Sequence, residues 1–379
     1  MRAVGAARRF LSSASIMALA AMFAPERAYA TCTYDVSGIG IIALSGDTCF
    51  AAGVYSGVPP GGVAFSASGT GVITSTSGVS ITTPLLPNAY GVHADGGGQI
   101  NLTAGIADVQ TSGAKAYDFF ASNGGAITLA SGKIKSTGAG AFGLYASGEF
   151  STITANGSPT IQTFGAGADG AVADAGGAIS LMNGGAITTN QGGSIGLVVR
   201  GSSSTITGSG LIVVSNGDSV SPPDTGAAFN DGAGFSDAPG LTLTDSTLAA
   251  TGTAAFGVYT KNGGSTSLSG GSVSTAGDSA PGLWASGSGS NITATNGTTV
   301  STSGSNAYGV QADTGGAVTL NGGTVMTSGA GAFGLYATGT GGETGVPSTI
   351  TATNVAVTTG VDPGPGTGAT GVLAEAGGK

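Results

Sequence analysis

The sequence predicts an all-β fold: a right-handed parallel β-helix, that is, a solenoid of three-strand coils with about 26 residues each. Two observations predict it. The segment GAGAFGLYATG at Gly329 to Gly339 recurs almost unchanged at Gly138 to Gly148, and weaker copies follow along most of the chain. A second column, an aliphatic residue before a Thr, Ser or Gly turn, keeps nearly the same spacing over some 270 residues. A fixed period of this length is the signature of a solenoid.

We call one position of the repeat the anchor: the residue in the place of Phe333, followed by Gly and then by an apolar residue. Seven of the ten spacings between successive anchors are 25 to 27 residues. The position after the anchor is Gly in ten of eleven copies, with Asp118 as the exception. The anchors are Tyr90, Tyr117, Phe142, Asp169, Ile195, Thr225, Phe256, Pro281, Tyr308, Phe333 and Thr370.

Each copy offers three short runs of alternating residues, separated by Gly, Asn and Asp, and none offers helical spacing. Alternation in the copy from Asn306 predicts an inward set of Tyr308, Val310, Ala312, Val318, Leu320, Val325 and Thr327. Gln311, Thr319 and Met326 are predicted to point outward. Stacked coils pair each strand with its equivalents above and below, and parallel crossovers favour a right-handed path.

Residues 1–30 are predicted to be a secretory signal peptide. Arg2, Arg8 and Arg9 precede an apolar run from Phe10 to Ala24, and Ala28-Tyr29-Ala30 fits an A-x-A cleavage site. We expect export through the Sec pathway, to the cell surface and outer membrane or into the medium. No later apolar run approaches the ~18 residues of a membrane-spanning helix.

Residues 31–89 are strand-rich but off period, which predicts an irregular N-terminal cap. Cys32 and Cys49 are expected to form a disulfide within this cap, since exported proteins favour disulfides. Two free thiols are the alternative. The repeats then run over 90–379, and loops are expected to leave the rod at Ser215 to Gly240, Gly341 to Pro347 and Asp362 to Gly368. Lys379 falls in mid-coil, so we expect the chain to be the front part of a longer protein.

The composition and the motifs argue against nucleic-acid binding, cofactor or metal binding, and catalysis. Removing the signal, whose four basic and one acidic residues carry +3, takes the formal net charge from −9 to −12 and leaves six basic residues. Such an acidic rod is not expected to bind nucleic acid. No cofactor or metal motif is present, and we expect no catalytic residues and no enzyme activity. The acids after the first run of each copy (Asp95, Asp174, Asp313, Glu375) alternate with Ser, Arg and Lys, which predicts solvated turns.

One outward row carries the predicted ligand-binding residues. Three positions after the anchor stand His93, the single histidine, and the aromatic residues Tyr145, Tyr259, Trp284 and Tyr336. The full row is predicted as His93, Phe120, Tyr145, Val172, Val198, Ala228, Tyr259, Trp284, Gln311, Tyr336 and Leu373. Exposed aromatic side chains can stack on sugars or bury against a partner. Burial of this row inside the rod or under turns is the alternative.

The repeats also carry a family likeness. Their form, as in Ala141 to Gly143 with Tyr145, Asn123 to Leu129 and Gly322 to Val325, resembles the passenger domains of type V autotransporters, particularly the pertactin-like, adhesin-type passengers. The resemblance implies a cell-surface β-helix carried by a C-terminal outer-membrane barrel of the same polypeptide, which this sequence does not contain. It further implies an adhesin that binds a host or environmental glycan or a matrix protein. A carbohydrate-active, pectin lyase-like enzyme and an inert stalk are the alternatives.

Overall fold

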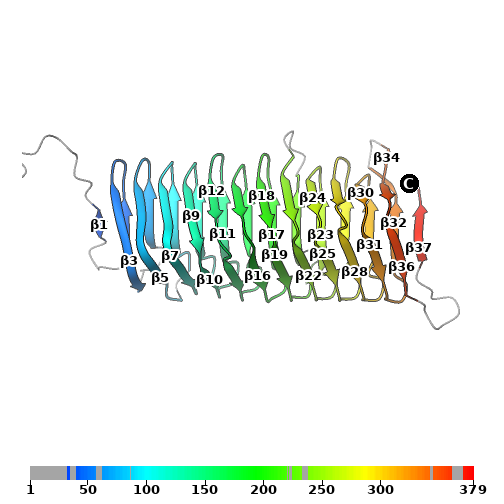
Figure 1. The fold of residues 1–379 in the computed structure, drawn as a ribbon, viewed down its shortest axis with the longest axis horizontal. Coiled ribbons are helices and arrows are strands. Elements are labelled where there is room, and N and C mark those ends of the chain that lie inside the picture. The colour runs from blue at the N-terminus through cyan, green and yellow to red at the C-terminus, as the bar shows by residue number, and fades with distance from the viewer. Residues whose placement is uncertain are drawn as a thin grey trace, which may run out of the picture.

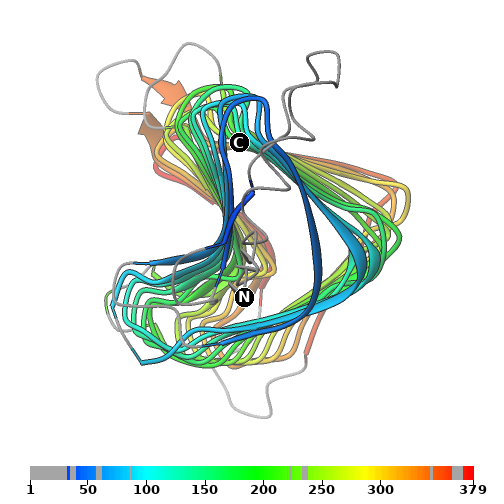
Figure 2. The same ribbon diagram turned by 90° about the vertical axis from the view of Figure 1, so that its left-hand side faces the viewer.

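A computed structural model describes residues 32–34, 40–56, 62–85, 87–219, 221, 224–232, 238–341, 345–360 and 370–379 of the chain. The strands of these residues stack as a parallel β-solenoid of about 11 turns, with no helix among them. They form one long rod, along which the chain advances steadily from its N-terminal to its C-terminal end (Figure 1). Viewed along the rod, successive coils largely superimpose (Figure 2). The predicted all-β solenoid is therefore confirmed. The predicted signal peptide, 1–30, lies outside the described residues.

Three ladders of strands run the length of the rod. The first ladder is a 14-stranded sheet in which every pairing is parallel except that of its first two strands. Its strands are β1 (Thr33–Tyr34), β2 (Ile41–Ala43), β4 (Val63–Ser68), β6 (Tyr90–Asp95), β8 (Tyr117–Ser122), β11 (Phe142–Ser147), β14 (Ala171–Asp174), β17 (Ile195–Arg200), β20 (Gly226–Asp231), β23 (Phe256–Lys261), β26 (Leu283–Ser286), β29 (Val310–Asp313), β32 (Phe333–Thr338) and β37 (Thr370–Glu375).

The second and third ladders start from three long strands and then separate. The long strands are β3 (Thr48–Ser56), β5 (Val72–Thr82) and β7 (Gln99–Thr111). The second ladder continues as β9 (Ala126–Ser131), β12 (Thr152–Ala155), β15 (Ala178–Leu181), β18 (Thr205–Ser209), β21 (Gly240–Thr244), β24 (Ser265–Ser269), β27 (Asn291–Thr295), β30 (Ala317–Asn321) and β35 (Thr349–Thr353). The third ladder continues as β10 (Lys133–Ser136), β13 (Thr160–Thr163), β16 (Gly185–Thr189), β19 (Leu211–Ser215), β22 (Thr247–Ala250), β25 (Ser272–Thr275), β28 (Thr299–Thr302), β31 (Thr324–Thr327) and β36 (Ala356–Thr359).

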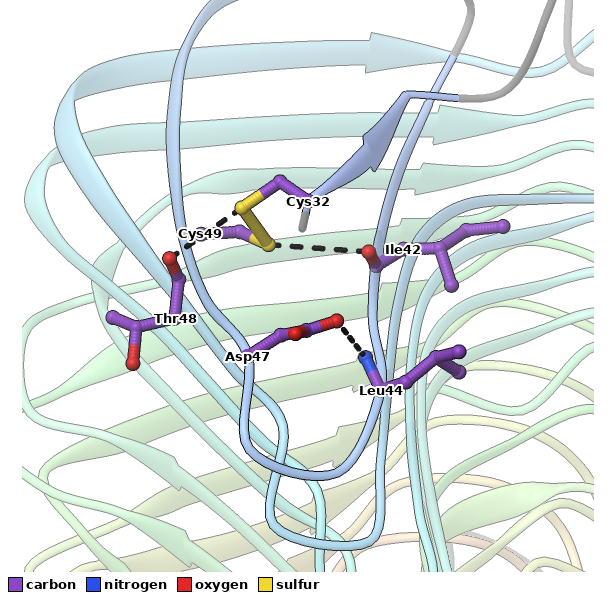
Figure 3. The surroundings of a disulfide bond; sticks show 6 residues. All are labelled: Cys32, Ile42, Leu44, Asp47, Thr48 and Cys49. Carbon is purple, nitrogen blue, oxygen red and sulfur yellow. Dashed lines mark hydrogen bonds between the residues drawn. A yellow bond between two sulfur atoms is a disulfide. The ribbon is translucent and has the colours of Figure 1, made fainter. Parts of the chain in front are cut away.

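The regular pairing extends further toward the N-terminus than residue 90, where the sequence predicts it to begin. β2 and β4 already pair in parallel with the strands that follow them in the first ladder, and β3 pairs in parallel with β5. A disulfide joins Cys32, just before β1, to the buried Cys49 of β3, with Cα atoms 5.6 Å apart (Figure 3). It ties the first short strand to the first complete coil.

The segment from Ser215 to Gly240 is not the single extruded loop that its Pro and Asp residues predict. β20 lies inside it and pairs in register with β17 and β23. The extra residues therefore fall before and after a normal rung of the first ladder. At Gly341 to Pro347 the expected excursion contains a short antiparallel ribbon of β33 (Thr340–Gly341) and β34 (Val346–Pro347). The predicted excursion at Asp362 to Gly368 lies outside the described residues.

The core follows the predicted alternation except at the anchor. Val310, Ala312, Val318 and Val325 are at most 1% exposed, whereas the side chain of Met326 is 45% exposed. Tyr308 departs from the prediction: it is half-buried, and its ring contacts Phe333 and Tyr336 on the outside of the first ladder. Strict alternation therefore fails at this position.

The glycine after the anchor explains this break. A Cβ atom on Gly309 would lie 2.5 Å from Cγ1 of Val325 and 2.7 Å from the carbonyl oxygen of Gly334 in the next coil. Gly309 and Val310 are consecutive buried residues, so the strand turns two neighbouring positions inward. The anchor before them then faces outward, on the same side as the residue three positions later. Close approach of backbone to side chain is a role that only Gly can fill at such a point.

Candidate functional site

The predicted outward row exists as a physical column on the first ladder. Strand pairing places its members directly above one another, and none of the five predicted aromatic or histidine residues falls out of register. We call this column the ridge. Its members are His93, Phe120, Tyr145, Val172, Val198, Phe229, Tyr259, Trp284, Gln311, Tyr336 and Leu373.

One predicted member of the ridge is wrong by one residue. Phe229, not Ala228, pairs with Val198 and Tyr259, and Ala228 is fully buried. The cause is that Gly226, rather than Thr225, pairs with the neighbouring anchors. A Cβ atom on Gly226 would come within 2.3 Å of the ring of Phe256. The missing side chain thus makes room for that ring, which is 0% exposed.

A second column of rings, formed by the anchors, runs beside the ridge and was not expected on the surface. Tyr90, Tyr117 and Phe142 lie next to His93, Phe120 and Tyr145, and neighbouring ring centroids are between 4.6 and 5.7 Å apart. Similar groups follow at Phe229, Phe256, Tyr259 and Trp284, and at Tyr308, Phe333 and Tyr336. Three aromatic groups therefore succeed one another along one face of the rod.

The rings cover one another's faces. His93 and Phe120 have planes 7° apart and centroids separated by 4.6 Å, while Tyr259 and Trp284 have planes 26° apart and centroids separated by 4.2 Å. Near-parallel rings at such distances are offset-stacked. The direction of stacking is along the rod, so the partly exposed rings of the ridge present their edges and polar ring atoms to solvent. The middle of the ridge is buried instead: Val172, Val198 and Tyr259 are 0%, 2% and 6% exposed, so the burial alternative holds for this part of the row. This arrangement leaves few free ring faces for a sugar to stack on.

The polar atoms of the ridge reach a column of residues at the ends of the strands. Tyr145 Oη donates a hydrogen bond to Asp174 Oδ2 at 2.9 Å, and Trp284 Nε1 donates to Asp313 Oδ2 at 2.8 Å. Tyr336 Oη donates to Glu375 Oε1 at 2.5 Å. Each donor bonds the acid of the following coil. All four acids of the prediction are the last residues of strands in the first ladder and stay at least partly exposed, and Asp174, Asp313 and Glu375 in addition each accept a hydrogen bond from the ridge.

Opposite charges alternate along part of this acidic column. Asp174 lies 3.3 Å from Arg200, and Asp231 in the next coil lies 3.3 Å from Lys261. Each carboxylate therefore has a cation beside it rather than a second carboxylate. Burial, followed by the nearby carboxylate of Asp174, raises the pKa of Tyr145 above its ordinary value. Burial raises the pKa of Tyr259 to about 12. These phenols therefore stay protonated at neutral pH, and Tyr145 donates its hydroxyl proton to Asp174.

His93 stands in a small polar cluster at one end of the ridge. Its Nε2 lies 2.9 Å from Ser122 Oγ, and Ser122 Oγ donates to Asp95 Oδ1 at 2.6 Å. Burial lowers the pKa of His93, and the Ser122 hydrogen bond lowers the pKa of Asp95. In a catalytic triad the carboxylate holds the histidine, which accepts the serine proton. Here Ser122 donates its hydrogen bond to the carboxylate of Asp95 and not to His93.

Two further acids lie outside the ridge: Asp118 in the interior of the rod and Asp169 in the anchor column beside the ridge. Asp118, which replaces the column glycine, is fully buried, and its Oδ2 accepts a hydrogen bond of 2.5 Å from Ser136 Oγ. Burial raises its pKa to about 8. Asp169 keeps part of its surface exposed, yet desolvation raises its pKa to about 7. Within the described residues, no three His, Cys, Asp or Glu side chains gather as a metal-binding group.

Comparison with known proteins does not assign the chain to a family. No protein-family model, no curated protein and no solved structure matches the chain. In the part of the chain that the structure describes, no helix has the length and apolar character needed to cross a membrane.

Proposed function

We propose that this protein is an exported, non-catalytic binding rod, the passenger part of an adhesin-type autotransporter, and that the ridge is its binding surface. The observation that carries the proposal is the succession of three aromatic groups along one face, each edged by hydrogen-bonded carboxylates. Aromatic residues beside polar partners are the side chains that most often anchor binding surfaces. The repeat likeness to pertactin-like passengers supports the assignment to this class.

The geometry of the ridge favours a macromolecular partner over a single sugar. Stacked rings offer edges, hydroxyl groups and an indole N–H beside carboxylates, and these suit a partner that is itself extended. A surface of a host or environmental matrix protein is the first candidate, and a long glycan chain is the second. Both can contact several coils at once, because coils repeat about every 4.8 Å along the rod.

The ridge can be altered with side chains that the same column already accommodates. The replacements Tyr145→Val, Trp284→Gln and Tyr336→Leu copy the next coil's residue at each site, namely Val172, Gln311 and Leu373. A matched control is Met326→Thr, which copies Thr358 on an exposed position of the third ladder. All four changes therefore preserve the strand positions and the stacked fold.

The full secreted chain and both variants are tested against immobilised matrix proteins and a glycan panel by biolayer interferometry. We expect the triple ridge variant to lose at least about tenfold in affinity, the scale on which a few interface residues dominate binding. The Met326→Thr control should bind as the wild type does. Equal binding by the ridge variant, or no binding by the wild type, would reject the ridge and favour an inert stalk.

The cluster of His93, Ser122 and Asp95 is the one observation that favours the enzymatic alternative. The hydrolysis or elimination of pectins and other glycans can be followed by reducing-sugar release and by unsaturated-uronate absorbance. We expect no turnover from the wild-type chain. Turnover that disappears in Ser122→Ala or Asp95→Asn would show that the protein is a carbohydrate-active enzyme.

A further inference from the structure

A hollow on a different face of the rod collects basic and amide side chains. It has a volume of about 440 Å³ and lies over the outer surface of the third ladder, across β5, β7, β10 and β13. Small-molecule sites typically enclose roughly 300–1,000 Å³. Ile81, Val109 and Ile134, in the middle of these strands, are 1% exposed and face the core. The residues on either side of them therefore point outward, into the hollow.

Two outward columns line the hollow. One contains Asp108, Lys133 and Thr160, and the other contains Gln110, Lys135 and Gln162. Coils lie about 4.8 Å apart and alternate residues of one strand about 7 Å apart, so the two lysines and two glutamines share one small patch. The patch offers ammonium groups next to amide and hydroxyl groups.

The lysines of the hollow differ from other cations of the rod. Arg200 and Lys261 each have an aspartate at 3.3 Å, whereas Lys133 and Lys135 have no carboxylate within ion-pair distance among the described residues. Lys135 instead lies over the ring of Phe164, with Nζ 5.4 Å from its centroid. The backbone N–H of Lys133 donates to Asp108 Oδ1 at 3.2 Å, which holds that carboxylate near the strand. Two of the six basic residues of the mature chain thus face the same hollow.

We propose that this hollow binds an acidic saccharide, with Lys133 and Lys135 contacting its carboxylate or sulfate group. Ammonium groups form charge-assisted hydrogen bonds to such anions. Gln110, Gln162 and Thr160 supply donors and acceptors for the sugar hydroxyls. The ring of Phe164, which contacts Lys135, is 39% exposed. A local basic patch is needed for such a ligand, because the remainder of this chain carries a net negative charge that repels it. The hollow lies on another ladder than the ridge, so the two binding surfaces are separable.

The test measures binding of the full secreted chain to three probes by isothermal titration calorimetry. The probes are an oligogalacturonate, a sulfated oligosaccharide and a neutral cello-oligosaccharide. The hollow variant is Lys133→Thr with Lys135→Gln, because Thr160 and Gln162 occupy the same positions in the next coil. The charge-matched control is Lys115→Gln with Lys379→Gln, which removes two positive charges outside the lining of the hollow.

We expect at least one acidic probe to bind and the neutral probe to bind more weakly. The hollow variant should lose about tenfold in affinity for the acidic probe, because it loses the two ion pairs that Lys133 and Lys135 would form. Which acidic probe binds identifies the anion as carboxylate or sulfate. Asp108→Asn, which removes a repulsive charge but keeps the acceptor of the Lys133 N–H, should strengthen binding. Equal losses in the hollow variant and the control would overturn the proposal, as would no binding of either acidic probe or equal binding of all three. The triple ridge variant should bind the acidic probe normally, so failure of the ridge and failure of the hollow are distinguishable.

Discussion

Asp118 is expected to make the rod less stable as the pH rises. It stands where most coils have the glycine that follows the anchor, and its side chain is fully buried between the first and third ladders. Its Oδ2 accepts the hydrogen bond of Ser136, while its Oδ1 has no hydrogen-bond partner among the described residues. A buried carboxyl group in such a place is easier to keep neutral than ionised.

The direction of the effect follows from the two pKa values. Burial raises the pKa of Asp118 from 3.8 to about 8 in the folded chain. Between these values the folded state holds a proton that the unfolded state has released, so the free energy of unfolding falls as the pH rises. The slope is about 1.4 kcal/mol per pH unit, which gives an upper value of roughly 5 kcal/mol between pH 4 and pH 8. The stabilisation is fully present below pH 4 and is lost by the time the pH passes about 8.

The variant Asp118→Asn removes the titration but keeps a hydrogen-bonding side chain, and Asp118→Gly restores the residue of the other coils. Thermal unfolding of wild type and variants is followed by circular dichroism from pH 4.5 to pH 9. Hydrogen exchange of peptides covering 109–145 reports on the same coils locally, because solenoids need not unfold as one unit. The wild-type curve should fall relative to both variants as the pH rises. If the three curves run parallel, Asp118 does not titrate as a buried acid and the reasoning is refuted.

Two matched pairs of substitutions test the packing. Gly309→Ala should lower the free energy of unfolding, measured by chemical denaturation, by about 1–3 kcal/mol, because the new Cβ would lie 2.5 Å from Val325. Gly371→Ala should be close to neutral, because a Cβ at Gly371 meets no atom within 4 Å. Equal effects of the two would contradict the close-approach argument. Thr302→Val should cost about 1 kcal/mol, because its buried hydroxyl donates to the carbonyl of Ala307 at 2.8 Å. Thr327→Val should cost less or stabilise, because the Thr327 hydroxyl is buried without a partner among the described residues.

Much of the fold could be predicted because the same pattern of residues recurs in nearly every coil. Two columns in step fixed the period, and the buried Val310, Val318 and Val325 lie where alternation put them. The outward position of Tyr308 could not be predicted from alternation, because the break depends on how closely Gly309 approaches the next coil. The register at Gly226 was equally hidden, because Thr225 is followed by Gly and satisfies the anchor pattern, whereas Gly226 is followed by Ala227 and does not. Only the fit of the Phe256 ring over a residue without a side chain separates the two.

The ridge shows where sequence reasoning about a site stops. A column of aromatic residues predicted an exposed strip, but not whether ring faces or ring edges would meet a ligand. That choice depends on the repeat itself: strands about 4.8 Å apart place identical positions at nearly the distance of stacked rings. The face of one ring is therefore covered by the ring of the next coil, as the face of Tyr259 is covered by Trp284. The polar atom of a ring remains available for a hydrogen bond to the residue that ends the strand of the following coil, as Trp284 donates to Asp313. Where the column lacks a ring, at Val172, Val198 and Gln311, the stacks end. Val172 and Val198 are buried, so of these three positions only the partly exposed Gln311 is open to a partner that stacks a flat group against Trp284 or Tyr336. Replacing Gln311 with Tyr should close this position and weaken the binding of such a partner.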